Sequence, residues 1–383
     1  MNTLDLTPAN RPMYRFLLTL TLCATFGLQA WRILFDNFAV GTLALDGSHV
    51  GTIQSVREIP GFLALLVVYV TLILKEHRIA SWSVVILGLG VAATGWFPSF
   101  QGLLMTTLVM SFGFHYFETV NQSLTLQYFD HATAPVVLGK LRSYGAAASI
   151  VSGILFFAAA PLLSYEELYT ASGLLILATG LISLKKNPTD PLAPAQHKRP
   201  VFRKRYGLFY FLTFMAGARR QIFIAFSVFL LVKRFHFSVQ EVALLFLFNN
   251  AVNFFISPLI GRAIVRFGER RILSIEYACL IVIFLAYAFT NSRLVVALLY
   301  ILDHVFFNFA MAIKTYFQKV AAPQGIAPSM AAGFTINHIA AVVLPVIGGL
   351  LWMVDYRIPF YAGAVMAGIS WMAVQKIPAK EAL

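Results

Sequence analysis

Charged residues are scarce in this chain of 383 residues. Asp, Glu, Lys and Arg together make up 12% of the sequence, whereas a soluble domain of this length carries roughly a quarter. Hydrophobic residues make up 59%, and the mean hydropathy is +0.77. This balance excludes an ordinary soluble enzyme and favours a membrane protein.

Cysteine and the common catalytic motifs are also missing or rare. The two cysteines, Cys23 and Cys279, lie in apolar runs and do not suggest a disulfide framework. The sequence contains no P-loop, no G-x-S-x-G and no H-E-x-x-H, which argues against ATP-driven pumping and against the hydrolases that use those motifs. We expect neither an enzyme nor a bound cofactor. The alternating pattern of outer-membrane strands is absent as well.

Long apolar runs recur along the whole chain instead. Because the backbone must satisfy its own hydrogen bonds in hydrocarbon, runs near twenty residues predict membrane-spanning helices. We therefore expect an all-α membrane protein. The twelve predicted spans are 13–42, 49–74, 79–97, 102–129, 141–163, 166–184, 207–232, 238–261, 272–290, 294–317, 327–353 and 358–375. We interpret the first as a retained span and not a signal peptide, because it is too long and contains Arg32 and Asp36.

The net charge of +13 follows the expected topology. With the N-terminus inside, eighteen Lys and Arg fall in cytoplasmic segments and four in outer loops. The positive-inside rule produces this bias, so we expect a multi-pass protein of the inner (cytoplasmic) membrane with both termini cytoplasmic and no nucleic-acid partner. The Pro-rich basic segment 185–206 is predicted to be a flexible linker that can also contact anionic membrane lipids.

The two sides of this linker resemble repeats of one another. AWRILFDNFAV from Ala30 aligns with ARRQIFIAFSV from Ala218, at an offset of 188, and His115 aligns with His304, at an offset of 189. Similar offsets at distant points indicate duplication, which is typical of secondary transporters. We therefore divide the chain into a six-helix bundle over 1–184, the linker over 185–206 and a second six-helix bundle over 207–383.

One loop carries a family signature. GRAIVRFGERR, residues 261–271, resembles the G-x-x-x-D-R-x-G-R-R loop of the major facilitator superfamily at the positions Gly261, Arg266, Gly268, Arg270 and Arg271. Val265 stands where the family has Asp, and Glu269 takes the first basic position after the second glycine. The equivalent loop between spans two and three, TLILKEHRIAS, matches the signature poorly. Span eleven resembles the tail of the family's P-x-x-G-G motif at Pro345, Gly348 and Gly349.

The resemblance implies a fold and a mode of action. It implies twelve transmembrane helices in two pseudo-symmetric six-helix halves, with helices one, four, seven and ten around a central path for a small-molecule substrate. It also implies that the 261–271 loop serves as a gate. We expect the protein to act as a monomer and to work by alternating access.

Polar residues near mid-depth in the spans are the candidate binding groups. Ionisable groups there are costly and usually face a bundle interior or a watery cavity. We expect Arg57 and Glu58 to point to different faces, Arg220 to reach the cavity in preference to Arg219, and Glu276 to brace the inner side. The candidate cavity residues are Arg32, Asp36, His115, Asn121, Arg220, Asp303, His304, Asn308, Asn337 and His338.

Two transport mechanisms and one non-transport role are compatible with this pattern. In the favoured one, Glu118, Asp36 or Asp303 binds and releases a proton while the arginines attract an anionic or amphipathic organic solute, with Glu118 as the first candidate and efflux slightly favoured. In the alternative, a transition metal is the substrate. The metal ligands would be His115, Glu118, Asp303, His304 and His338. The non-transport role is that of a receptor or scaffold, which would not need so many mid-membrane charges.

Overall fold

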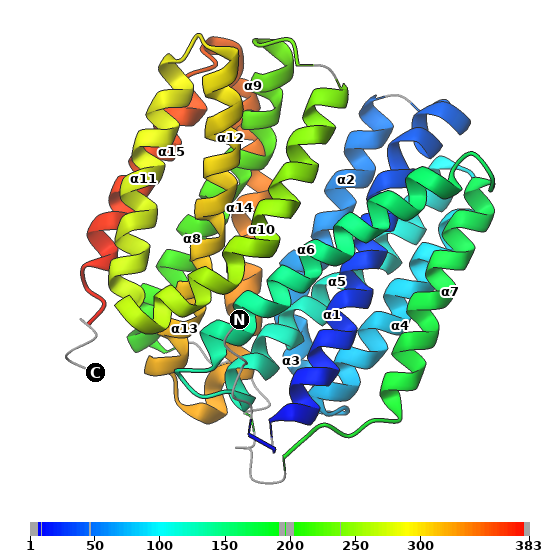
Figure 1. The fold of residues 1–383 in the computed structure, drawn as a ribbon, viewed down its shortest axis with the longest axis horizontal. Coiled ribbons are helices and arrows are strands. Elements are labelled where there is room, and N and C mark those ends of the chain that lie inside the picture. The colour runs from blue at the N-terminus through cyan, green and yellow to red at the C-terminus, as the bar shows by residue number, and fades with distance from the viewer. Residues whose placement is uncertain are drawn as a thin grey trace. The chain divides into compact units, whose positions relative to one another are not determined.

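The fold is built from helices alone over the residues that the computed structural model describes, which are 7–8, 10–45, 47–190, 196, 203–237 and 239–378. Figure 1 shows their arrangement along the chain. The α-helices are α1 (Arg11–Asp36), α2 (Gly47–Phe62), α3 (Val67–Val70), α4 (Glu76–Thr94), α5 (Phe100–Tyr128), α6 (Ala134–Ala159), α7 (Tyr165–Leu184), α8 (Gly207–Ile222), α9 (Val228–Lys233), α10 (Val239–Phe267), α11 (Glu269–Phe289), α12 (Arg293–Phe307), α13 (Met311–Val320), α14 (Ile326–Val354) and α15 (Ile358–Val374).

Short π or 3₁₀ segments join several of these helices without a break. The π-helices η1 (Asn37–Thr42) and η4 (Phe223–Ser227) follow α1 and α8, and the 3₁₀ turns η2 (Leu63–Leu66) and η5 (Asn308–Ala310) link α2 to α3 and α12 to α13. With these joints included, the helices of the described chain form twelve continuous stretches. Each stretch coincides with one predicted span, so the all-α, twelve-helix prediction is confirmed.

Two of the predicted boundaries are several residues off. α6 begins at Ala134 instead of 141, and α10 continues to Phe267 instead of 261. Both extensions carry polar or charged residues, among them Lys140, Arg262 and Arg266. Hydropathy marks the apolar part of a helix, whereas the helix itself continues as long as its backbone hydrogen bonds do.

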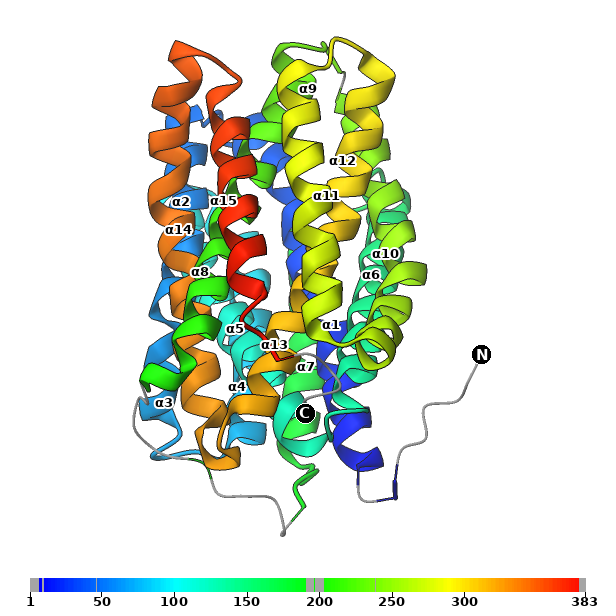
Figure 2. The same ribbon diagram turned by 90° about the vertical axis from the view of Figure 1, so that its left-hand side faces the viewer.

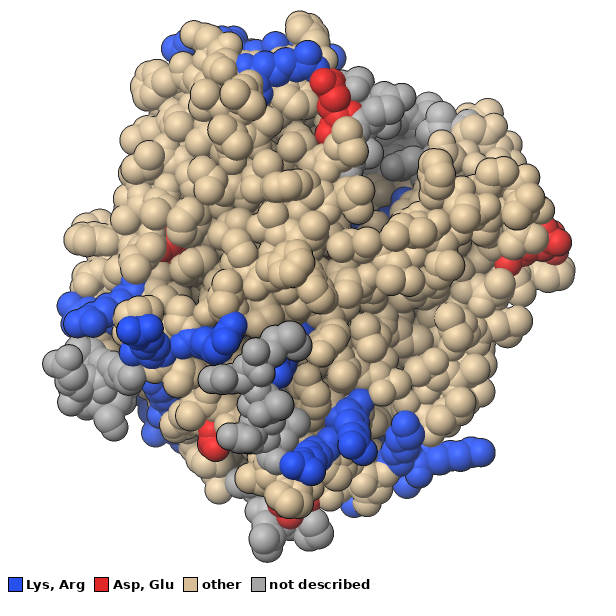
Figure 3. Space-filling view, in the orientation of Figure 1, with Lys and Arg blue, Asp and Glu red and all other residues tan. Residues whose placement is uncertain are grey.

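The surface of these helices suits a lipid environment. Among the described residues, eight helices are long and apolar enough to cross a membrane, and α15 is a shorter apolar helix. Large apolar side chains such as Ile73, Phe157 and Met353 are more than four-fifths exposed, which a soluble monomer rarely tolerates in such numbers. On the face shown in Figure 3, the Lys, Arg, Asp and Glu side chains gather mainly toward the helix ends.

The chain separates into two compact units, each of which borrows a segment from the other half of the sequence. Unit 1 comprises 1–129, 144–201 and 323–335, and unit 2 comprises 130–143, 202–322 and 336–383. The start of α6 thus belongs to unit 2, and the start of α14 belongs to unit 1. In unit 1, α4 lies between α5 and α7 and packs against both (Figure 1). In unit 2, α15 packs against α11 and α8 (Figure 2).

The first helix of each half is distorted at the same place. In the alignment of Ala30 with Ala218, the π-helix η1 in the first half overlaps the π-helix η4 in the second. π-helices are rare, since their hydrogen-bond geometry is poorer than that of an α-helix. Their coincidence agrees with the duplication that the sequence indicated.

Glycines allow the central helices of unit 1 to approach closely. A Cβ on Gly113 of α5 would lie 2.3 Å from the backbone nitrogen of Leu87 on α4. A Cβ on Gly173 of α7 would lie 2.3 Å from the nitrogen of Ala92, on the same α4. Small residues at helix contacts are the main device by which membrane helices pack.

The close approach at Gly113 can be tested by adding a side chain. We expect Gly113→Val to destabilise the protein by about 1–3 kcal/mol or more, because the α4 backbone cannot yield as a flexible side chain would. Gly153→Val on α6 is the matched control, since nothing lies within 4 Å of a Cβ there. The measurement is the midpoint of thermal unfolding in detergent, and equal shifts in both variants would contradict the packing described here.

Candidate functional site

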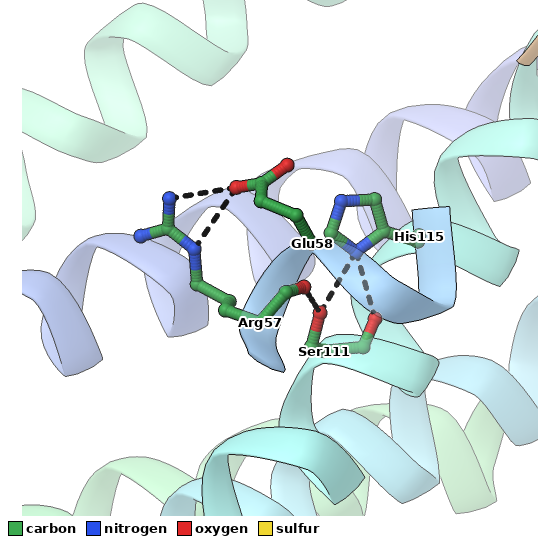
Figure 4. A network of polar contacts seen from close by, with 4 residues as sticks. All are labelled: Arg57, Glu58, Ser111 and His115. Atoms are coloured by element: carbon green, nitrogen blue, oxygen red, sulfur yellow. Dashed lines mark hydrogen bonds and ion pairs between the residues drawn. The ribbon is translucent and has the colours of Figure 1, made fainter. Parts of the chain in front are cut away.

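A polar network joins α2 to α5 in unit 1 (Figure 4). Arg57 and Glu58 form an ion pair, with Nη2 of Arg57 2.8 Å from Oε1 of Glu58. The prediction that these neighbours point to different faces is therefore wrong, because both side chains are long enough to fold back toward each other. The guanidinium of Arg57 also lies 5.8 Å from the ring of Trp31 on α1.

The ring of His115 is held in a defined tautomer. Its Nδ1 lies 3.0 Å from the carbonyl oxygen of Ser111, and a carbonyl can only accept, so Nδ1 carries a hydrogen. The Ser111 hydroxyl donates to the carbonyl of Arg57 and lies 2.9 Å from the same Nδ1. The other ring nitrogen faces the carboxylate of Glu58 (Figure 4), with the two groups within 4.8 Å. Phe334 contacts the imidazole edge-on.

The remaining unit 1 candidates lie in separate surroundings. Arg32 is exposed near the end of α1, and the side chain of Asp36 lies outside the described part, so the place of both in the cavity stays a prediction. Glu118 is half-buried, and its Oε1 accepts a hydrogen bond of 3.1 Å from Nε2 of Gln122. The Oδ1 atom of Asn121 is buried without a hydrogen-bond partner.

An ion cluster lies at the centre of unit 2. Arg219 on α8 has Nη2 3.5 Å from Oε1 of Glu276 on α11, and it donates from Nη1 to the Ser370 hydroxyl of α15 at 2.7 Å. Its guanidinium lies 4.2 Å from the ring of Tyr277. Asp303 on α12 interacts electrostatically with both Arg219 and Glu276. The three ionisable side chains are 4%, 2% and 3% exposed for Arg219, Glu276 and Asp303, so this cluster is fully enclosed.

The cluster differs from the arrangement predicted from the sequence. Arg219 makes the buried ion pair, and Arg220 is only partly buried, so the place of Arg220 in the cavity stays a prediction. Glu276 does not reach a helix end, because it is enclosed beside Arg219. Successive residues on a helix differ by about 100° in direction, so the two adjacent arginines have different surroundings.

A second polar cluster of unit 2 joins α10 to α12. Asn253 contacts the imidazole of His304, with Nδ2 2.7 Å from Nε2, and Asn308 donates from Nδ2 both to Oδ1 of Asn253 and to the carbonyl of His304. Asn253 and Asn308 are buried. Two atoms of this cluster, Nδ1 of His304 and Oδ1 of Asn308, are buried without a hydrogen-bond partner.

The last two candidates lie on α14, in its part that belongs to unit 2. Asn337 donates from Nδ2 to the carbonyl of Thr213 on α8 at 3.2 Å. The backbone carbonyl oxygen of Asn337 lies so close to Gly217 that a Cβ on that glycine would be 2.2 Å from it. His338 is buried. Asn337 therefore serves as a contact between α8 and α14, whatever else it does.

The backbone of the signature loop adopts a geometry that requires glycine. Gly268 is the single residue between α10 and α11, and its φ of 79° is one that side chains with a Cβ rarely adopt. Gly261 packs against the start of α6, where a Cβ would lie 2.4 Å from the carbonyl oxygen of Pro135. Arg270 donates to Oε1 of Gln375 from two nitrogens, at 3.2 Å each, whereas Arg266 and Arg271 are exposed.

The acidic departure from the signature has a partner of its own. Glu269 is buried at the first position of α11, and its Oε2 lies 2.8 Å from Nζ of Lys319 at the end of α13. Glu76, the first residue of α4 in unit 1, accepts hydrogen bonds of 2.8 Å from Ser123 and from Gln127 near the end of α5. A carboxylate at a helix N-terminus also interacts favourably with the helix dipole. In both halves, the acid that follows this loop therefore binds the end of the following span: Glu76 binds α5, and Glu269 binds α13.

The gate assignment leads to a prediction about the signature loop. We expect Gly268→Val and Arg266→Ala to slow solute translocation more than they weaken solute binding, because the loop links two helices that must move together. At Gly268 the β-branched side chain would also strain the backbone by about 1–3 kcal/mol. Gly207→Val is the control, because Gly207 has helical φ and open space around it. Normal turnover in both loop variants, at normal expression, would refute the gate role.

The fold and these sites can be compared with known proteins. Solved structures of similar fold include the human organic anion transporter MFSD10 (TETRAN), with a TM-score of 0.77 at 12% identity over 97% of this chain and 100% of that one. FucP in its outward conformation gives 0.76 at 13% identity, covering 96% and 99% of the two chains. An outward-facing bacterial homologue of the iron transporter ferroportin gives 0.77 at 15%, covering 95% and 98%. At such identities the likeness concerns the fold alone.

Sequence comparison identifies the family. A curated relative, Multidrug resistance protein 1 of Bacillus subtilis (strain 168), is 34% identical over 119 residues, which make up 30% of this chain and 30% of that protein. The sequence profile described as Major Facilitator Superfamily matches residues 17–335. Since that profile covers most of the chain and the fold agrees with it, the protein belongs to the major facilitator superfamily, a family of multi-pass membrane transporters.

Proposed function

We propose that this protein is a secondary active transporter that moves a small organic solute by alternating access and couples the movement to protons. The observation that carries the coupling is the cluster of Arg219, Glu276 and Asp303 in unit 2. It contains two enclosed carboxyl groups and one guanidinium.

A count of charges explains why this cluster should hold a proton. If both carboxyls were ionised, one negative charge would have no partner in an apolar interior, and an unpaired buried ion costs several kcal/mol. One oxygen of each acid, Oε2 of Glu276 and Oδ2 of Asp303, lacks a hydrogen-bond partner. A single proton on either acid leaves one balanced ion pair with Arg219. A change in the enclosure of the cluster during transport would then bind or release that proton.

Among the sequence candidates for coupling, this argument favours Asp303. Glu118 is half-buried and accepts a hydrogen bond of 3.1 Å from Nε2 of Gln122. Asp303 is enclosed, and Arg219, which could hold it ionised, has Oε1 of Glu276 at 3.5 Å. The two acids therefore compete for one cation.

The class of solute is proposed from the side chains of the spans and from relatives. The arginines of the spans and the many aromatic side chains favour an anionic or amphipathic organic molecule. Structural relatives include a human organic anion transporter, a fucose:proton symporter and a bacterial homologue of the iron transporter ferroportin. The partial match to a multidrug resistance protein supports the slight preference for efflux.

Transport of a transition metal is the second candidate. It is favoured by the pair of Glu58 and His115, whose carboxylate and imidazole lie within 4.8 Å and face each other. A carboxylate and an imidazole are good ligands for such ions. Among the other predicted ligands, however, Glu118 is bonded to Gln122, Asp303 interacts with Arg219 and His304 contacts Asn253. Arg57, which is paired with Glu58, would also repel a cation.

The cellular setting is proposed from the sequence. The charge bias supports insertion in the inner membrane with both termini cytoplasmic. The boundaries 1–184, 185–206 and 207–383 are our proposed bundles and linker, and most of the linker lies outside the described residues. We propose that the protein acts as a monomer whose partners are its solute, protons and membrane lipids.

Charge-neutralising variants test the coupling. We expect Asp303→Asn, which imitates the protonated acid, to keep solute exchange at equilibrium while losing accumulation driven by a pH gradient. Glu118→Gln is the matched comparison and should keep both. The measurement is gradient-driven uptake beside equilibrium exchange in reconstituted vesicles. Loss of accumulation in Glu118→Gln alone would move the coupling to Glu118, and dependence on Mn²⁺ or Fe²⁺ instead of pH would favour metal transport.

Topology can be tested independently of the solute. Reporter fusions after residue 195 and at the C-terminus should both report the cytoplasm, because the positive charges of 185–206 and of the tail resist translocation. A fusion after Arg293, in a predicted outer loop, is the control that should report the periplasm. A periplasmic signal from either of the first two fusions would break the six-plus-six arrangement.

A further inference from the structure

The cluster of Asn253, His304 and Asn308 in unit 2 has hydrogen-bonding polarity that can be worked out atom by atom. Asn308 has its amide group against the backbone carbonyl of His304, and a carbonyl can only accept, so the NH₂ of Asn308 is on that side. The same NH₂ donates to Oδ1 of Asn253. Asn253 therefore turns its own NH₂ toward Nε2 of His304.

The polarity of the imidazole follows from this chain of bonds. Because Nε2 of His304 accepts from an amide, the neutral ring carries its hydrogen on Nδ1. That N–H is buried without a partner, and so is Oδ1 of Asn308. The cluster thus presents one unsatisfied donor and one unsatisfied acceptor. A buried donor or acceptor without a hydrogen bond is destabilising, so something is expected to bind there.

Two irregular helix segments lie at the same place. Asn308 opens the 3₁₀ turn η5 between α12 and α13. Phe223 opens the π-helix η4, and its ring lies 5.1 Å from that of Tyr300 and 6.0 Å from His304. Departures from α-helical geometry inside long helices often mark functional positions. The coincidence of two distortions with two unsatisfied polar atoms is the second reason to consider a ligand.

The surroundings limit what kind of ligand fits. Phe223 and Phe307 lie beside the imidazole, with ring centroids 6.0 and 6.5 Å away, so an apolar body suits the site. Arg142, whose guanidinium lies 5.2 Å from the ring of Phe307, places a positive charge near His304. A carboxylate could accept from Nδ1 but has no hydrogen to donate to Oδ1 of Asn308. An ammonium could donate to Oδ1 but cannot accept from Nδ1, and the positive charge of Arg142 disfavours it.

We propose that Asn253, His304 and Asn308 form a recognition subsite for an uncharged hydroxyl group on the transported solute, next to its aromatic or aliphatic part. A hydroxyl both donates and accepts, so it can bind either unsatisfied atom. This subsite rests on the proposed transport function, because it assigns part of the solute. It is independent of the proton coupling, which involves Arg219, Glu276 and Asp303.

A matched probe series tests the subsite by binding alone. The probes are 3-phenylpropanol, 3-phenylpropanoate, 3-phenylpropylammonium and propylbenzene, titrated calorimetrically into the full-length protein in detergent without any gradient. We expect the alcohol to bind best. Replacing His304→Phe removes the donor and should weaken alcohol binding about threefold to tenfold, the loss of one neutral hydrogen bond, while leaving propylbenzene unchanged. His304→Asn, whose amide can stand in for Nδ1, should restore part of the preference.

Two further variants keep the test decisive. Asn308→Leu removes the acceptor and should reduce the preference for the alcohol in the same way. Asn250→Ala is the control, because the Asn250 amide is bonded to the carbonyl of Phe246 within its own helix. The proposal is overturned if the wild-type protein does not prefer the alcohol, or if His304→Phe and Asn308→Leu fold and keep the preference, in which case water alone occupies the site.

The same variants, reconstituted in vesicles, separate the subsite from the proposed transport function. A lost alcohol preference in variants that still accumulate solute along a pH gradient supports the subsite and leaves the coupling intact. Hydroxyl-dependent binding by a protein that shows no transport in vesicles would overturn the transport function and not the subsite chemistry.

Discussion

A charge enclosed among apolar helices must be balanced within reach of its own side chain, and this constraint organises unit 2. Arg219 is held by Glu276, by the Ser370 hydroxyl and by the face of Tyr277, so one side chain connects α8, α11 and α15. Removing the carboxylate of Glu276 would deprive this buried cation of its ion-pair partner. Asp303 adds a second acid to the same cation. The cluster therefore stabilises the packing of these helices and also holds the charge imbalance on which the proposed coupling depends.

The polar network of unit 1 and the two polar clusters of unit 2 differ in their hydrogen bonding. In unit 1 the network of Arg57, Glu58, Ser111 and His115 is compact, and the backbone carbonyls of Ser111 and Arg57 take part in it. In unit 2 the ion cluster and the Asn253–His304–Asn308 cluster are distinct, and both contain atoms without partners. Fully bonded networks rigidify a protein, whereas incompletely bonded ones have capacity for a proton or a solute. This difference is why we assign coupling and hydroxyl recognition to unit 2.

Close backbone contacts supply the rest of the packing. At Gly113, Gly173 and Gly261 the neighbouring backbone occupies the space of a Cβ, so helices meet without intervening side chains. The loops between paired helices are very short, and Gly268 alone joins α10 to α11. The acids that begin α4 and α11 attach these loops to α5 and α13. Motion of such a loop must therefore be transmitted to the attached helix.

The sequence by itself determined the number, order and approximate ends of the spans, because apolar length is a local property and each span needs one uninterrupted run. It also indicated the duplication, the family and several polar positions, among them His115, Asp303, His304 and Asn308. Only the tertiary structure decided which of these side chains meet. It paired Arg219 with the enclosed Glu276, paired Arg57 with Glu58 and brought Asn253 to His304. The direction of a side chain depends on helix rotation and on neighbours distant in the chain, and a difference of one residue turns it by about 100°.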